Sequence, residues 1–221
     1  MDISKGDKMI KSIKGFTLAE VLITLGIIGV VAALVMPNLV ANLQRQYFKA
    51  KLKKSYSILL NALLEMERDS GQRVSPTDYN SVKFIYSFKN YFKLAKDCGM
   101  RECVPQTGCN YKTYNKHSEI SCGLLDDGQF ILLDGSMILL ENPSGVSKVL
   151  ISVDVNGYKN LPNILGVDLF TFQLMSDGRL LPMGAEGTSH DETSYCSKTS
   201  TSDVNGIACT NRALYDDDFL K

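Results

Sequence analysis

The chain has 221 residues, of which 24 are Lys or Arg and 24 are Asp or Glu, so its formal net charge is zero. Hydrophobic residues make up 44% and charged residues 22%, which is ordinary for a globular protein and excludes a disordered chain, a collagen and a coiled-coil rod. A zero net charge also argues against a non-specific nucleic-acid binder, because such a protein needs a basic surface.

Residues 16–36 form an apolar stretch, FTLAEVLITLGIIGVVAALVM, in which Glu20 is the one charged residue. A helix of this length spans about 30 Å, which is enough to cross the hydrocarbon core of a bilayer. A secretory signal peptide also begins with basic residues, but its apolar run is shorter and a small-residue cleavage site follows it. The sequence therefore predicts a retained membrane span, although basic residues on both sides leave its orientation open.

Glu20 is the residue of this span that requires an explanation. A carboxylate inside the hydrocarbon is costly unless it is paired, and the alternative is a glutamate close enough to the membrane edge to reach water. Residues 14–21, Lys-Gly-Phe-Thr-Leu-Ala-Glu-Val, resemble the cleavage motif of type IV prepilins and type II secretion pseudopilins. That resemblance implies that a prepilin peptidase cuts between Gly15 and Phe16 and methylates the new amino terminus.

The resemblance also implies a partner for Glu20 and an orientation for the chain. Cleavage leaves a positive amine on Phe16, one helical turn before Glu20, and the two charges can neutralise each other within a chain or between neighbours. In the family, the matching carboxylate is thought to pair with the amine of an adjacent subunit. Residues 1–15 would then be a cytoplasmic leader, and the rest would lie outside the inner membrane, which the chain crosses once.

Pro37 ends the apolar run, and a proline inside a helix removes a hydrogen bond and kinks the chain. The family has a proline at this place, where the helix bends or locally melts on assembly, which makes Pro37 a candidate assembly residue. An ordinary helix stop is the alternative. Apolar residues nevertheless return at helical spacing from Leu39 to Leu64, so we predict one long helix over residues 16–70 with its transmembrane part at 16–36.

Two patterned regions lie along this helix. Gly26, Gly29 and Ala33 place small residues on roughly one face, which suits close approach of a second helix, although plain membrane-helix composition explains them equally well. Residues 45–54 contain five basic residues and no acid. They are suited to anionic lipid headgroups or to the interior of a filament, or they form an ordinary solvated helix face.

Residues 71–221 are expected to form an extracytoplasmic globular domain. Ser75-Pro76-Thr77 predicts the start of a second helix, whose apolar residues run at helical spacing from Val82 to Ala95. Strands are then predicted at residues 129–133, 136–141, 148–154, 168–175 and 179–181, with tight turns at Asp-Gly sequences.

Helices followed by antiparallel strands indicate an α+β fold. The order matches the pilin-like architecture, in which a long N-terminal transmembrane helix packs on a small antiparallel β-sheet domain. The chain after Pro182 is rich in Gly, Ser, Thr and Asp, and we interpret it as a loop closed by a disulfide and not as a further domain.

All the cysteines lie beyond the membrane span, where disulfides are the natural state. They are Cys98, Cys103, Cys109, Cys122, Cys196 and Cys209. No C-x-x-C pair occurs, so neither a zinc ribbon nor a thioredoxin-type site is indicated. Cys196–Cys209 is the favoured pair because it would close the irregular tail, and many pilins have such a C-terminal loop. The pairing of the other four is left open.

Oxygen-bearing side chains cluster between two predicted strands, at Asp154, Asn156, Asn160, Asn163 and Asp168. Ca²⁺ is bound by six to eight oxygens, and some pseudopilins bind calcium in a loop beside the sheet. An EF-hand is rejected, because Tyr158 and Lys159 stand where a ligand and a glycine belong and Leu165 replaces the closing glutamate. Two interpretations remain: a calcium site made by Asp154, Asn156, Asn163 and Asp168, or simple turns at Asn-Gly and Pro-Asn.

No motif of the sequence indicates catalysis, because a nucleophile elbow, a P-loop and a GxGxxG are all missing and the two histidines lie in polar stretches. Tyr111 and Tyr114, next to Lys112 and Lys116, have the chemistry to stack on single-stranded DNA, but the patch is short. We therefore expect a protein that is not an enzyme and that does not act on nucleic acid.

The resemblance implies a structural subunit of a type IV pilus or of a type II secretion pseudopilus. Its implied partners are copies of itself or related pilins, a prepilin peptidase, membrane lipid, and an inner-membrane assembly platform with its ATPase. One alternative is a minor tip pilin that binds a surface, DNA or a secreted substrate. Another is a membrane-tethered receptor that never polymerises and keeps its leader.

Overall fold

The computed structural model describes residues 15–79, 83–142 and 148–219. Its chain divides into two compact units, Met1–Leu43 and Gln44–Lys221. Most of the predicted leader, residues 1–14, lies outside the described residues, as does Val82 of the predicted second helix.

The long N-terminal helix is α1, Leu18–Ser70, and it continues through Pro37. The prediction of one helix across this proline is therefore confirmed. Gly71 follows the helix with φ +71°, and its N–H donates to the Glu67 carbonyl at 2.9 Å, which ends the helix in a left-handed turn. By length and composition, α1 contains a segment able to cross a membrane.

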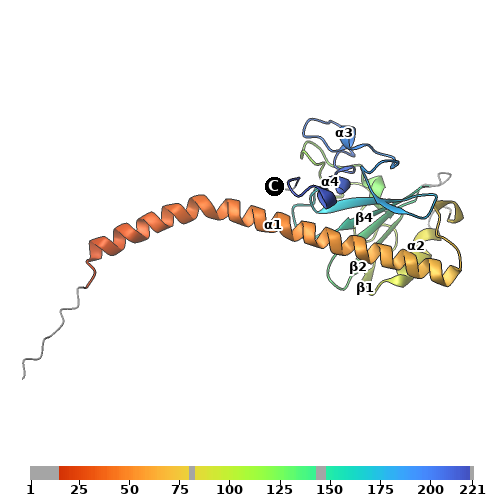
Figure 1. The fold of residues 1–221 in the computed structure, drawn as a ribbon, viewed down its shortest axis with the longest axis horizontal. Helices are drawn as coiled ribbons and strands as arrows, with labels where there is room; N and C mark the ends of the chain where they lie inside the picture. Colours follow the sequence, from red (N-terminus) through yellow and green to blue (C-terminus); the bar gives the residue numbers. More distant parts are fainter. Residues whose placement is uncertain (1–14, 80–82, 143–147, 220–221) are drawn as a thin grey trace, which may run out of the picture. The chain divides into compact units, whose positions relative to one another are not determined.

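The second unit is built on a six-stranded antiparallel sheet with the strand order β1-β2-β3-β4-β5-β6 (Figure 1). Its strands are β1 Leu94–Asp97, β2 Gly128–Leu132, β3 Met137–Glu141, β4 Val149–Asp154, β5 Leu169–Leu174 and β6 Leu180–Pro182. Each strand pairs with the next one along the chain, so the sheet is a meander. With α1, this sheet gives the α+β pilin-like architecture that the sequence predicted.

Alternate residues of the strands face two separate cores. On one face, Ile138 and Phe172 join a cluster that includes Leu52, Leu59 and other buried residues of α1. On the other face, Met137, Leu139 and Leu150 pack with the residues of the disulfide-bonded loops. Because both faces are covered, β4 is buried along its whole length and does not show the alternation of a half-exposed strand.

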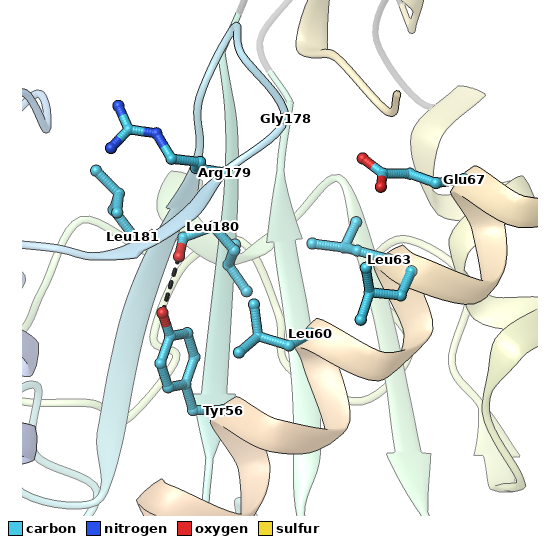
Figure 2. Close-up of a pocket in the computed structure, with 9 residues that line it drawn as sticks. Tyr56, Leu60, Leu63, Glu67, Gly178, Arg179, Leu180 and Leu181 are labelled. Atoms are coloured by element: carbon cyan, nitrogen blue, oxygen red, sulfur yellow. Dashed lines mark hydrogen bonds between the residues drawn. The ribbon is translucent and has the colours of Figure 1, made fainter. Parts of the chain in front are cut away.

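The part of α1 that belongs to the second unit packs on the sheet and also covers the sheet's edge at β6. The Tyr56 ring stacks on Phe172 with 5.0 Å between ring centroids, and its hydroxyl donates to the Leu180 carbonyl at 3.0 Å. Figure 2 shows Tyr56, Leu60 and Leu63 of α1 pointing toward Leu180, and together these residues line a shallow groove. The hydrogen bond therefore occupies a carbonyl of the edge strand.

The predicted second helix, from Ser75-Pro76-Thr77 to near Asp97, is wrong in its second half. The chain forms a short 3₁₀ turn at Pro76–Asp78, then α2 at Lys83–Phe88, and a second 3₁₀ turn at Lys89–Tyr91. Leu94–Asp97 is then strand β1, which pairs with β2. The apolar spacing is real over α2, but hydrogen bonding to an open sheet edge is a long-range interaction that outweighs local periodicity.

The tail after Pro182 is folded, so its interpretation as a mere loop is also wrong. It contains two short helices, α3 at Glu192–Tyr195 and α4 at Cys209–Tyr215. Ala213 and Leu214 of α4 are buried in the core on the α1 face of the sheet. A helix of seven residues makes only about two turns, so its apolar residues give too weak a periodic signal to be recognised in such a polar stretch.

Candidate functional site

The first turn of α1 is stabilised by Thr17 and Glu20. The Thr17 N–H donates to Glu20 Oε2 at 2.8 Å, and the Glu20 N–H donates to Thr17 Oγ1 at 3.2 Å. This reciprocal arrangement is a capping box, which satisfies two backbone donors that a helix start leaves open. Glu20 thus has a local role that the sequence analysis did not recognise, in addition to the assembly role predicted for it.

The predicted cleavage site lies immediately before this cap. Phe16 is 87% exposed, and a Cβ placed on Gly15 would meet nothing within 4 Å. The fold of the chain therefore imposes no requirement for glycine at position 15. Removing residues 1–15 would leave Thr17 and Glu20 in place and would put a new amine next to their hydrogen bonds.

The predicted membrane span is apolar, and within residues 15–79, 83–142 and 148–219 nothing covers any of its sides. From Leu18 to Met36, every residue except the half-buried Ala32 is exposed. Gly26 and Gly29 also have open space where a Cβ would be, so no intramolecular contact explains them. A surface of this kind requires lipid or other protein segments to cover it.

The basic residues of 45–54 are mostly neutralised by acids from distant parts of the chain. Lys49 contacts Asp217 at 2.6 Å, while Lys54 and Lys51 contact Asp134 at 2.6 and 3.7 Å. Burial alone would raise the pKa of Asp134, but hydrogen bonds from Lys54 and Ser136 outweigh it and hold the pKa well below its usual range. The Lys49 and Lys51 side chains are only 16% and 19% exposed, so these two lysines make contacts within the unit and the interpretation of a solvated helix face is wrong for them.

The six cysteines form three disulfides, Cys98–Cys103, Cys109–Cys122 and Cys196–Cys209. The favoured C-terminal pair is thus present, and the four cysteines whose pairing was open join their neighbours in sequence. Cys109–Cys122 belongs to the core on the face of the sheet opposite α1, where Tyr111 is fully buried. A buried Tyr111 cannot stack on a nucleotide, which removes half of the predicted aromatic patch.

The predicted cation residues are brought together at one end of the sheet. Asp154 ends β4 opposite Leu169 of β5, and the Val155 N–H donates to the Asp168 carbonyl at 2.9 Å. Asp154 and Asp168 are both 0% exposed. The connection between them, residues 155–167, therefore holds two buried carboxylates close together.

Both carboxylates accept hydrogen bonds that shape this connection. Asp154 Oδ1 accepts from the N–H groups of Asn156 and Gly157 at 3.2 and 2.7 Å. Asp168 accepts from the N–H groups of Asn163 and Ile164 at 2.8 and 2.6 Å. The turns that the sequence offered as an alternative to a cation site are thus real, and the two aspartates organise them.

Tyr111 completes this cluster and was not recognised from the sequence. Its hydroxyl donates to Asp154 Oδ2 at 2.6 Å, over a separation of 43 residues. Burial raises the pKa of both aspartates, and hydrogen bonds only partly offset it; for Asp154 the negative charge of Asp168 adds to the rise. No local pattern could have found Tyr111, since the contact exists only in the folded chain.

A second acidic cluster, which the sequence analysis also missed, lies where β2 begins and β3 ends. It consists of Asp126, Asp127 and Glu141, with Arg101 contacting Asp126 at 2.9 Å. Burial raises the pKa of Glu141 to about 8, and the two neighbouring aspartates add to the effect. The strand pairing, not the sequence spacing, brings these groups together.

Residues 10–36 match the family model described as the prokaryotic N-terminal methylation motif. No curated protein and no solved structure matches the chain. The matched segment covers Lys11 and Lys14 before the predicted cleavage site, the Thr17–Glu20 cap and the whole apolar span. It supports a prepilin-type protein of the type IV pilin or pseudopilin kind, anchored in a membrane, and it implies processing by a prepilin peptidase and assembly with other pilin subunits.

Proposed function

We propose that this prepilin-type chain is a structural subunit of a type IV pilus or a type II secretion pseudopilus and that it polymerises through the first half of α1. The observation that carries the proposal is the N-terminal methylation motif on a helix whose apolar surface is covered by none of the residues that the structure describes. The leader would be cytoplasmic, and the unit from Gln44 onward would lie outside the inner membrane.

Glu20 would have two roles in turn. In the unprocessed chain its carboxylate caps the helix through Thr17. After cleavage, the amine of a neighbouring subunit would approach the same carboxylate and supply the positive charge that this carboxylate lacks. The assembly platform and its ATPase would then extract the subunit from the membrane into the filament, with Pro37 at a place where the helix lacks one backbone hydrogen bond.

Processing and assembly can be tested with three variants in the native cell. Intact-mass measurement of the wild-type membrane fraction should show loss of residues 1–15 and gain of one methyl group. Gly15→Glu should stay uncleaved, because the peptidase must approach a backbone without a side chain. A full-length, unmethylated wild-type chain would contradict the proposal and would favour the tethered receptor.

Glu20→Gln and Glu20→Leu separate the charge from the cap. Glutamine keeps the acceptor of the capping box, whereas leucine removes both the acceptor and the charge. We expect both variants to insert and both to give few filaments in sheared-filament preparations. Normal filament numbers from Glu20→Gln would show that the charge is not used in docking and that Glu20 serves only to cap the helix.

A further inference from the structure

We propose that a cavity on the face of the sheet opposite α1 binds an apolar group that carries a carboxylate, the chemistry shared by the C-terminal residue of a peptide and by a small aromatic acid. The cavity has a volume of about 400 Å³, which lies within the range of sites for small ligands. Every residue that lines it belongs to the second unit of the chain, so the inference is independent of filament assembly.

The cavity lies where three segments of the chain meet. They are β1 with the loop closed by Cys98–Cys103, the β2–β3 hairpin, and the first part of the connection between β4 and β5. The hairpin and the connection touch each other closely, since a Cβ placed on Gly157 would lie 2.4 Å from the Gly135 carbonyl oxygen. Two of the three walls are therefore in direct backbone contact, which only a residue without a side chain allows.

The floor of the cavity is apolar. Met137 is 1% exposed and belongs to the core opposite α1. Cys103, Ile131 and Tyr158 are half-buried and pack against the same core. An apolar group that enters the cavity would lose contact with water on several sides, and this burial favours binding.

Hydrogen bonds within the chain hold the walls in place before a ligand arrives. The side-chain oxygen of Gln129, a residue that is 0% exposed, accepts from the N–H groups of Cys103 and Val104 at 3.2 and 2.9 Å. On the opposite wall, the Tyr158 hydroxyl accepts from Asn110 Nδ2 at 3.2 Å. Because these groups are already ordered, binding costs little conformational entropy.

The rim of the cavity supplies the charge. Lys96 and Lys159 line it and are exposed, and within residues 15–79, 83–142 and 148–219 neither forms a salt bridge. Among the described residues that line the cavity, Glu102 is the one acid. Two lysines against one glutamate leave the rim with an excess of positive charge, which attracts an anion.

An apolar floor below a cationic rim selects the class of ligand. A ring or an apolar chain would fill the cavity, and its carboxylate would stay at the mouth, where the lysine ammonium groups can reach it. Inorganic phosphate would gain nothing from the floor, and a neutral apolar molecule would gain nothing from the lysines. The two features together therefore indicate a molecule that is apolar at one end and anionic at the other.

Fluorine NMR tests the cavity in the full-length protein in detergent, with its disulfides intact. The probe is N-acetyl-4-fluorophenylalanine, and its amide, which lacks the charge, is the matched control ligand. We expect saturable line broadening with a Kd of about 10⁻⁴–10⁻³ M for the acid and at least about fivefold weaker binding of the amide. Detergent micelles take up the neutral amide more readily than the acid, so a preference for the acid cannot come from the detergent.

Four variants locate the binding. Lys96→Gln and Lys159→Gln should each weaken binding of the acid about two- to fivefold and leave the amide unaffected, because exposed ion pairs contribute about this much. Glu102→Gln should strengthen binding of the acid by a similar factor. All three side chains are exposed, so these substitutions leave the core intact. Lys53→Gln, on α1 and outside the cavity, is the matched control and should bind as the wild type does.

An acetylated hexapeptide that ends in the same fluorinated residue separates the two sources of the ligand. Binding at least as tight as that of the single residue identifies the C-terminus of a polypeptide, and weaker binding identifies a small acid. Absence of saturable broadening, equal affinity for the acid and the amide, or unchanged affinity in both lysine variants would overturn the proposal.

Discussion

Leu59→Ala should destabilise the second unit far more than Leu64→Ala, although both residues lie on α1. Leu59 is 0% exposed in the core between the helix and the sheet, whereas Leu64, one of the residues that line the groove, is 60% exposed. Truncating a fully buried leucine leaves a cavity and costs about 3 kcal/mol, and truncating a mostly exposed one costs less than about 1 kcal/mol.

Thermal melting of the two variants checks this difference. A loss of about 3 kcal/mol lowers the melting temperature of a unit of this size by about 6–12 °C, so Leu59→Ala should melt well below the wild type. Leu64→Ala should remain within about 3 °C of it. The melts are followed by circular dichroism of the full-length protein in detergent. Equal shifts in the two variants would refute the assignment of the buried face of α1.

Two further predictions concern the disulfides and the pH dependence of stability. Replacing Cys196 and Cys209 by serine should lower the free energy of unfolding by about 3 kcal/mol, and replacing Cys98 and Cys103 should lower it by about 2 kcal/mol, because a longer closed loop restricts the unfolded chain more. The variant without Cys196–Cys209 should therefore have the lower melting temperature. The reverse order would contradict loop entropy as the cause. Burial raises the pKa of Glu141 to about 8, so its protonated form favours the folded state, and this stabilisation is lost as the pH rises from about 4 to 8. At pH 8, Glu141→Gln should therefore be more stable than the wild type by about 1–2 kcal/mol, after allowing for partial exposure, and should melt at a higher temperature. At pH 4 the two proteins should melt at nearly the same temperature. A constant difference at both pH values would exclude Glu141 as the titrating group.

The elements that the sequence predicted well are those whose signal is local. The α1 helix follows from an apolar span and from a helical spacing that resumes after Pro37. The hairpin between β2 and β3 follows from Asp134-Gly135, where Gly135 has φ +84° and Asp134 accepts from Ser136. In both cases the residues that specify the structure are neighbours along the chain.

The errors concern structure that distant residues specify. Strand β1 exists because β2 offers a sheet edge more than thirty residues away, and its own sequence, LAKD, carries no strand signal. The ion pair between Lys54 and Asp134 is a second example. It could not be predicted from residues 45–54, because that stretch of helix contains no acid and the partner lies far away in the sequence. Contacts of this kind need the folded chain before their partners can be named.

The cation residues fall between these cases. The aspartates and asparagines of the β4–β5 connection stand out by composition, and the turns between them are readable from Asn156-Gly157 and Pro162-Asn163. What the sequence does not show is that both aspartates are fully buried and accept hydrogen bonds from the N–H groups of these turns, which are properties of the fold. Composition therefore identified the loop, and only the folded chain shows how its aspartates are packed.

The two halves of α1 differ in a way that would let one helix serve both the proposed assembly and a folded domain. From Phe48 to Met66, buried residues recur every three or four positions, so this half has one face to bury and the sheet buries it. From Leu18 to Met36 no such face exists, because apolar residues surround the helix and its glycines have open space. A single sheet covers one face only, whereas lipid, or a bundle of like helices, covers all of them. If the chain polymerises as proposed, the first half exchanges one complete environment for another when a subunit leaves the membrane, and Glu20, its one charged residue, is the group that we propose makes that exchange specific.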